Sequence, residues 1–174
     1  SCCERVRRIN PECAVMAECC FFTDQTAERL LERGFDYVVD AIDRPLQKCL
    51  LIAGCHARGI PVVTAGGAAG RRDPTAVRVA DLARSTHDAL LQEVRRGLRR
   101  EHGFPREGKV FGVECVYSTE ELALPATGRE VPGVGPGESD SRPSGGGLLG
   151  TAAFVTGAFG LATAAVVVRR LAGQ

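Results

Sequence analysis

Two short apolar segments separated by a helix-like stretch constrain the fold more than any other feature of this chain. Residues 35–42 (FDYVVDAI) and 60–65 (IPVVTA) are rich in β-branched and aromatic residues, as strands are. The stretch between them begins at Pro45 and runs to residue 58, with Gly59 after it, which is typical of a helix. Strands joined by a helical crossover lie parallel, and continuous apolar runs indicate strands covered on both faces. The sequence therefore predicts an α/β fold with a doubly wound, mostly parallel sheet.

The flanking segments continue this alternation and indicate one domain over residues 1–174. We expect helices at 4–9, 25–33 and 86–101, strands at 13–22, 76–80 and 109–117, and an apolar helix over 147–171. The stretch 127–147 is rich in Gly, Pro and Ser and is predicted to be a flexible loop. The domain then divides into residues 1–75 (the sheet core), 76–126 (a substrate-facing part), the loop, and a C-terminal helix over 148–172.

Charge and cysteine content argue against two classes of protein: those that bind nucleic acid through a strongly basic overall charge, and those with a structural zinc site of C-x-x-C type. The 22 basic and 21 acidic residues nearly cancel, so any nucleic-acid surface must be a local patch. None of the eight cysteines is spaced C-x-x-C, so the usual thiolate pairs of a structural zinc site are missing. No secretory signal is present, and we interpret the cysteines as buried free thiols in a reducing compartment.

Two carboxylates flank the end of the first apolar strand. Ligands of doubly wound sheets bind beyond the carboxyl ends of the strands, where Asp40 and Asp43 stand. Mg²⁺ prefers hard oxygen ligands and keeps part of its water shell, so one carboxylate plus nucleotide phosphates suffices. Lys48, five residues beyond Asp43, is placed to reach a phosphate. The alternative is a capping Asp and a solvated Lys, which the spacing alone favours.

Gly66 and Gly67 follow the second strand and open a glycine-rich stretch that ends at Gly70. Glycines permit close backbone approach, so this stretch is a candidate cradle for an anion or a substrate. A wide turn leading into Asp73 explains it equally well. The spacing matches neither a dinucleotide-binding fingerprint nor a Walker A sequence.

The predicted helix over 86–101 carries four arginines on one side, Arg95, Arg96, Arg99 and Arg100. Such a cluster can contact RNA phosphates, which makes it a candidate RNA-binding face. A solvated helix face is the more frequent explanation of such a run, and no aromatic residues for base stacking are interleaved.

Two further features have a structural and a functional interpretation. Cys115 lies in a predicted strand with no identifiable activating base, so we interpret it as a buried structural thiol and assign no catalytic residue. Residues 144–168 contain no charged side chain, a length that permits a membrane span through 148–168. Because much of this segment is Gly, Ala and Thr, a buried core helix is the preferred interpretation.

Several strings together resemble one family. They are 8–13 (RINPEC), 40–43 (DAID) with Lys48, 60–64 (IPVVT) running into 66–68 (GGA), 73–75 (DPT), 81–83 (DLA) and 112–120 (GVECVYSTE). In this order they resemble the C-terminal part of the tRNA threonylcarbamoyladenosine dehydratases, which belong to the ubiquitin-activating-enzyme superfamily of ThiF/MoeB type. Any one string is weak evidence, but the ordered set is fairly specific.

The resemblance implies a Rossmann-like fold and an ATP-dependent cyclisation of threonylcarbamoyladenosine in tRNA, through an acyl adenylate. It further implies Mg²⁺, a tRNA partner and a homodimer. Asp43 matches the family's magnesium and nucleotide aspartate, and Lys48 matches a basic position in the helix after it.

Two departures bear on activity. The family's Gly-rich nucleotide loop and basic catalytic residues lie upstream of residue 1, so we expect this chain alone to bind ATP poorly and to be inactive. Residues 142–147 (RPSGGG) lack the cysteine that bacterial relatives carry there. The alternative functions are activation of a sulfur-carrier or ubiquitin-like protein, and an inactive binding module or membrane-tethered scaffold. We expect a cytoplasmic or mitochondrial location, with membrane association as the alternative.

Overall fold

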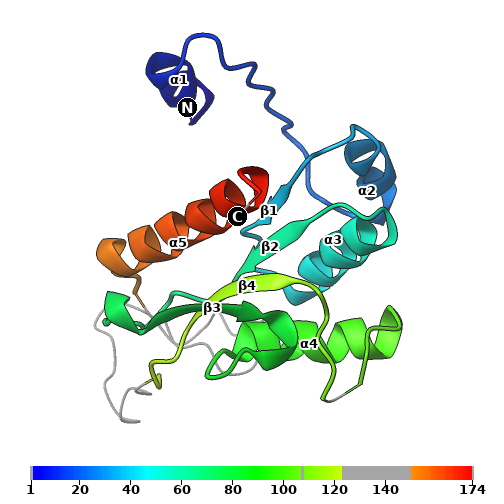
Figure 1. Cartoon of the computed structure of the whole chain (residues 1–174), viewed down its shortest axis with the longest axis vertical. Helices are drawn as coiled ribbons and strands as arrows, with labels where there is room; N and C mark the ends of the chain where they lie inside the picture. Colours follow the sequence, from blue (N-terminus) through cyan, green and yellow to red (C-terminus); the bar gives the residue numbers. More distant parts are fainter. Residues whose placement is uncertain (1, 107, 123–149, 174) are drawn as a thin grey trace, which may run out of the picture.

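A four-stranded mixed sheet forms the centre of the molecule (Figure 1). The computed structural model describes residues 2–106, 108–122 and 150–173. The strands are β1 (Val38–Asp40), β2 (Val62–Ala65), β3 (Val77–Asp81) and β4 (Glu114–Ser118), in the order β1-β2-β4-β3. β1, β2 and β4 run parallel, and β3 pairs antiparallel with β4. The mostly parallel α/β fold is confirmed, and residues 76–126 supply two of the sheet's own strands.

Helices cover both faces of this sheet. α2 (Asp24–Leu31), α3 (Pro45–Ala57) and α4 (Ala89–Glu101) lie on one face, and α5 (Ala153–Leu171) lies on the other, with short 3₁₀ turns η1 (Pro74–Ala76) and η2 (Leu82–Arg84) beside β3. The strand residues alternate accordingly, because successive side chains point to opposite faces. Val62 and Cys115 pack with the α3 and α4 side, whereas Val63 and Val116 pack against Val155 and its neighbours on α5.

Local sequence signals set the limits of α3 close to those predicted, whereas α4 and α5 begin three and six residues later than expected. Pro45 occupies the first turn of α3, and Gly59 follows its end at φ +66°, a left-handed conformation that glycine adopts without strain. α3 and α4 then approach closely at Gly97, where a Cβ atom would lie 2.8 Å from the Cys49 sulfur. Only a glycine fits this crossing without a shift of the thiol.

The N-terminal segment differs from the prediction. Residues 13–22 form no strand and are mostly exposed, and α1 (Cys2–Ile9), which ends at Ile9 as expected, has no buried residue. Figure 1 shows this segment leading away from the sheet. An apolar run becomes a strand only where a neighbour completes its hydrogen-bond ladder, and the described residues pair no strand with it. The cysteines at 13, 19 and 20 are therefore exposed, which corrects the expectation of buried thiols.

β1 is shorter and less covered than its sequence indicates. It spans three residues at the edge of the sheet, and Val39 is 51% exposed on the face that α5 covers only in part. An edge strand has a neighbour on one side only, so its apolar residues are incompletely shielded. The prediction of a strand covered on both faces is wrong for this position.

α5 confirms the predicted C-terminal helix but is buried along one face only. Val155, Phe159 and Val166 point into the core, whereas Phe154 and Leu161 are more than half exposed. The interpretation as a buried core helix therefore holds for its inner face alone. With 19 residues and a mean hydropathy of 1.4 it also has the length and composition of a membrane span. The predicted loop at 127–147 lies outside the described residues.

Candidate functional site

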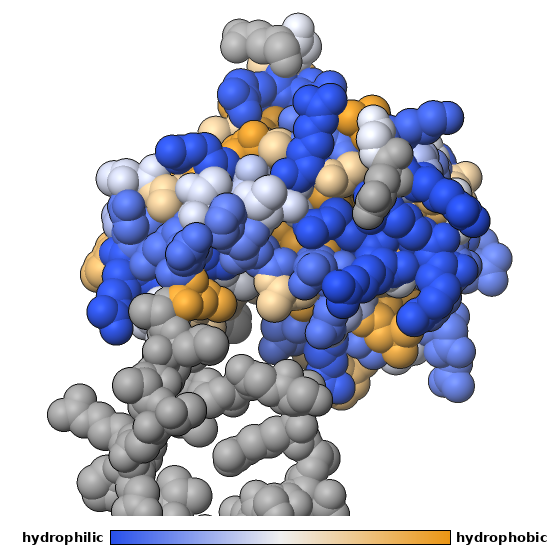
Figure 2. Space-filling view, turned by 90° about the horizontal axis from the view of Figure 1, so that it is seen from below, coloured by the Kyte–Doolittle hydropathy of each residue, from blue (hydrophilic) through white to orange (hydrophobic). Residues whose placement is uncertain are grey.

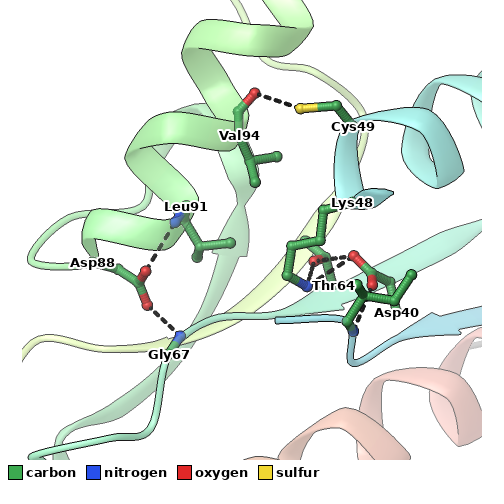
Figure 3. A network of polar contacts seen from close by, with 9 residues as sticks. Asp40, Lys48, Cys49, Thr64, Gly67, Asp88, Leu91 and Val94 are labelled. Carbon is green, nitrogen blue, oxygen red and sulfur yellow. Dashed lines mark hydrogen bonds and ion pairs between the residues drawn. The ribbon is translucent and has the colours of Figure 1, made fainter. Parts of the chain in front are cut away.

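The carboxyl ends of β1 and β2 hold a buried polar triad (Figure 3). Asp40 ends β1 and stands beside Thr64 in the register of the two strands. Its Oδ2 accepts hydrogen bonds from Lys48 Nζ (2.9 Å) and from Thr64 Oγ1 (2.7 Å), and Lys48 Nζ lies 2.9 Å from Thr64 Oγ1. All three residues are fully buried. Each charge therefore has its partner inside the protein, as buried charges require.

This triad changes the role predicted for Lys48. Its burial lowers the pKa of the ammonium group, and the adjacent Asp40 carboxylate opposes that shift. Because the side chain points into the core, the expectation that Lys48 reaches a phosphate is not met in this structure. The Asp40 carboxylate is likewise withdrawn from the edge, where it was expected to contact nucleotide. Its Oδ1 instead accepts from Ile42 N at 3.0 Å and shapes the turn that leads to Asp43.

Asp43 is the carboxylate that this turn presents to solvent. It is exposed, and within the described part of the chain no hydrogen bond or ion pair occupies its oxygens. The donor chemistry fits Mg²⁺, which takes one or two protein carboxylates and completes its shell with phosphate oxygens and water. No cluster of three or more His, Cys, Asp or Glu side chains gathers in the described residues, so a cation here would depend on Asp43 and phosphates.

The turn after β2 that contains Gly66 and Gly67, here called the glycine corner, binds the carboxylate of Asp88 from the same chain. Gly67 N donates to Asp88 Oδ2 at 2.9 Å, and Leu91 N donates to Asp88 Oδ1 at 2.9 Å (Figure 3). Gly66 N donates to Val116 O at 2.8 Å. A Cβ atom at Gly66 would lie 2.2 Å from the Asp88 carboxylate, so this position requires glycine. The backbone N–H groups of Gly66 and Gly67 are thus occupied internally, which argues against the expected cradle for an anion or a substrate.

Asp88 was missed by the sequence analysis although a signal exists. It is the N-cap of α4 and precedes a helix whose Leu91, Val94 and Leu98 are buried. An Asp directly before an apolar helical repeat is a recognised capping signature. Its second contact, to Gly67, depends on a residue 21 positions away and has no local signal.

An apolar hollow of about 420 Å³ lies between the carboxyl ends of the strands and α5. Its size falls within the range of about 300–1,000 Å³ usual for small-molecule sites. Its lining consists of Val39, Ala41, Ala65, Gly66, Ala68, Thr156, Phe159, Gly160, Thr163 and Ala164. The small side chains on α5 keep this hollow open beside the turn that carries Asp43.

Comparison with known proteins identifies the family. Residues 1–174, the whole chain, match the ThiF family. The chain belongs to the ThiF family. It is 36% identical over 170 residues to the tRNA threonylcarbamoyladenosine dehydratase of Escherichia coli, covering 97% of this chain and 63% of that protein. It is 43% identical over 123 residues to the Haemophilus influenzae enzyme of the same name, covering 70% and 47%.

Solved structures support the same relationship. The E. coli tRNA N6-threonylcarbamoyladenosine dehydratase, TcdA, in complex with ATP superimposes with a TM-score of 0.82 at 34% identity, covering 98% of this chain and 62% of that one. The same enzyme with AMP gives 0.81. The fold and the resemblance drawn from the ordered sequence strings are thus confirmed. This ThiF chain spans less than two thirds of the length of these relatives.

A buried arginine fixes the loop that follows the ThiF chain's glycine corner. Arg71 Nε donates to Gly67 O at 3.3 Å, and its other nitrogens donate to the carbonyls of His87 and Glu120. The Glu120 carboxylate in turn accepts from the backbone N–H groups of Arg72 and Asp73. The loop is therefore tied to β4 and to the start of α4, a function that the sequence did not indicate.

The four arginines predicted as one RNA-facing side of α4 have two different environments. Arg95 donates to Ser85 Oγ, and Arg99 donates to Pro105 O at 3.2 Å while its guanidinium lies 5.1 Å from the centre of the Phe111 ring. Arg96 and Arg100 are exposed. The prediction that all four arginines share one RNA-facing side is therefore wrong for Arg95, which packs back onto the domain.

Cys115 confirms the prediction of a buried structural thiol. It is fully buried, and desolvation raises its pKa to about 12. A thiol becomes a nucleophile only as a thiolate, so this cysteine is unreactive near neutral pH. Burial also raises the pKa values of Cys49 and Cys55 to about 11. None of these three thiols is suited to thioester chemistry.

Proposed function

We propose that this ThiF chain belongs to an ATP-dependent tRNA threonylcarbamoyladenosine dehydratase. The observation that carries the proposal is the superposition of 98% of the chain on the ATP complex of the E. coli enzyme at 34% identity. The free carboxylate of Asp43, at the strand edge where α/β sheets bind ligands, supports it independently.

The proposed reaction removes one water from the modified nucleoside in two steps. A threonyl carboxylate oxygen attacks the α-phosphorus of ATP, pyrophosphate leaves, and an acyl adenylate forms. A nitrogen of the same modification then attacks the activated carbonyl, loses its proton and closes the ring, while AMP departs with the bonding electrons of the C–O bond. Because the second step is intramolecular, positioning supplies much of its rate. No cysteine thioester is needed, which agrees with the buried state of Cys115.

The chain's own residues would contribute positioning and charge. Asp43 would hold Mg²⁺, which when bound neutralises developing negative charge on the phosphoryl group. The buried triad of Asp40, Lys48 and Thr64 fixes the turn before Asp43 and is assigned a positioning function. The apolar hollow against α5 suits a purine ring, the group that ATP and the modified nucleoside share.

We also propose that the protein acts as a homodimer in the cytoplasm or in mitochondria. The exposed apolar outer face of α5 supports association, because apolar area left in water is unfavourable. Light scattering in detergent-free buffer should give twice the monomer mass. Monomers that float with lipid vesicles would instead assign α5 to a membrane.

Nucleoside mass spectrometry tests the activity directly. Purified protein is incubated with threonylcarbamoyl-modified tRNA, ATP and Mg²⁺, and the modified nucleoside should lose the mass of one water only when ATP is present. Omission of Mg²⁺ should suppress the reaction. Pyrophosphate release that needs an added ubiquitin-like carrier protein, with no change in the tRNA, would contradict the proposal.

Asp43 has a matched control at the other end of β1. Asp43→Ala should lower kcat/KM by about 100-fold or more, because it removes the group that anchors charge stabilisation at the phosphates. Asp36, also exposed but at the amino end of β1, lies away from the proposed site, and Asp36→Ala should retain activity. Equal rates for the two variants would remove Asp43 from the mechanism.

A further inference from the structure

A shallow hollow lies at the end of α4, and the described residues that line it are all arginines. Arg96, Arg99 and Arg100 come from the last turns of the helix, and Arg106 comes from the segment just after it. The molecule seen from below, the side on which Figure 1 draws α4, is mostly hydrophilic (Figure 2). Arg106 is not in the helical run that the sequence analysis identified, and only the turn at 102–105 brings it to the same hollow.

The four guanidinium groups combine fixed and free side chains. Arg99 is held by its hydrogen bond to Pro105 O and by the Phe111 ring. Arg96 and Arg100 are exposed, and the contact of Arg100 with Glu101 is a surface ion pair that a stronger ligand can replace. Such a set presents rigid and adjustable forks of N–H donors, the arrangement that suits phosphate oxygens.

The lining favours a polyanion over a protein partner. Stable protein interfaces centre on aromatic or aliphatic anchors, and the described residues that line this hollow include none. Nucleic-acid backbones are bound mainly through Arg and Lys contacts to phosphates, independently of sequence.

The position of the hollow indicates which part of an RNA it would contact. α4 begins at Asp88, which holds Gly67 at the carboxyl edge of the sheet. Residues 96–100 follow 8 to 12 positions later, a distance of about 12–18 Å at about 1.5 Å per helical residue. That distance corresponds to roughly four or five stacked nucleotides at about 3.4 Å each.

We propose that the hollow formed by Arg96, Arg99, Arg100 and Arg106 is a phosphate-binding subsite that holds the RNA backbone several nucleotides from the reacting base. The inference rests on the proposed function for the identity of the RNA as tRNA. The subsite itself requires neither ATP nor catalysis, so it can be tested separately.

The test measures binding of a fluorescent tRNA by anisotropy over a series of salt concentrations, without ATP. Arg96→Gln/Arg100→Gln should weaken binding severalfold and reduce the slope of log K against log salt by about 1.4–1.8, the value for two lost phosphate contacts. The matched control is Arg58→Gln/Arg169→Gln, which removes two exposed charges at the end of α3 and on α5. It should leave the slope unchanged, and both variants should unfold at the wild-type temperature.

The outcomes separate this proposal from the proposed function. Loss of the salt slope in a protein that does not dehydrate threonylcarbamoyl-tRNA would support the subsite and contradict the activity. Normal dehydration with an unchanged slope and KM in the Arg96/Arg100 variant would overturn the subsite and leave the activity standing. Competition by polyglutamate stronger than by RNA would assign the hollow to an acidic protein and would also overturn it.

Discussion

Asp40 shows how one residue links the core to the candidate site. Its Oδ2 is neutralised by Lys48 and Thr64 inside the core, and its Oδ1 fixes the backbone of Ile42 just before Asp43. A buried ion pair contributes little net stability compared with apolar residues, because both charges lose their hydration. We therefore attribute this pair to the geometry of the turn rather than to the stability of the domain.

Removal of one partner of this pair should be far worse than removal of both. Lys48→Met leaves the Asp40 carboxylate buried without a counter-ion, and should lower the free energy of unfolding by about 3–5 kcal/mol. The double variant Asp40→Asn/Lys48→Met should recover most of that loss, because no buried charge remains and the Asn oxygen still accepts from Ile42 N. Urea denaturation measures both. A double variant less stable than Lys48→Met would show that the ion pair itself stabilises the fold.

The eight cysteines should divide into two kinetic classes. Cys49, Cys55 and Cys115 are buried, whereas the five between residues 2 and 20 are exposed or partly exposed. Since reaction requires access and a thiolate, a disulfide reagent at pH 8 should modify five thiols quickly and three only after denaturation. The absorbance of the thiolate released from the reagent gives the number of modified cysteines. Fast modification of all eight in the folded protein would contradict the buried environment of Cys115.

At the scale of elements, α5 acts as one wall of the site as well as a cover for the sheet. Its inner residues complete the core, and its small residues leave the apolar hollow open next to the ends of β1 and β2. Glycine in a helix interior is unfavourable by about 0.5–1 kcal/mol relative to alanine. Gly160 lines the hollow, and it therefore lowers the stability of α5 while leaving the hollow open.

Two glycines of α5 offer a matched pair of variants. Gly160 lines the hollow and Gly157 does not, and a Cβ atom at either position meets nothing within 4 Å. Gly160→Leu should raise the melting temperature by about 2–4 °C through helix propensity, yet reduce the proposed dehydratase activity by filling the hollow. Gly157→Leu should give a similar rise in melting temperature with normal activity. If Gly160→Leu remains fully active, the hollow takes no part in substrate binding.

At the scale of the whole molecule, buried acids with raised pKa values make stability sensitive to alkaline pH. Burial raises the pKa of Tyr37 from 10.0 to about 12, and that of Cys115 from 9.0 to about 12. Cys49 and Cys55 rise from 9.0 to about 11. At a pH between the ordinary and the raised pKa values, the unfolded chain loses protons that the folded chain keeps, so alkaline pH favours unfolding. Lys48, with a lowered pKa, acts in the opposite direction but is a single group.

The free energy of unfolding should therefore be retained below pH 9.0, the ordinary thiol pKa. It should fall progressively between pH 9 and pH 11, the window set by the ordinary and raised thiol values. Denaturant titrations at pH 7.5, 9 and 10.5 measure the trend, and Cys55→Ala should make the decline shallower. Constant or rising stability up to pH 10.5 would contradict the raised pKa values of the buried thiols.

The sequence by itself determined the family and most of the elements, although the strand expected at 13–22 does not form. Pro45, Gly59 and the capping residues before α2 act within a few positions, so their helix limits are predictable from local chemistry. The sequence alone also revealed the apolar runs that form β1 and β2, and the ordered strings shared with the dehydratases. The position of Asp43 at the strand edge followed from the same pattern, because the carboxyl ends of parallel strands meet at one edge.

Tertiary structure decided which polar groups face solvent and which face one another. Thr64 and Asp40 are 24 positions apart, and Gly67 and Asp88 are 21 apart, so neither contact has a local signature. For the same reason Lys48 was expected at a phosphate and lies in the core, and Arg95 was expected on one face with the other three arginines of α4 but packs back onto the domain. Caps and turns form from neighbours in the chain, whereas burial and charge pairing are set by segments that only folding brings into contact.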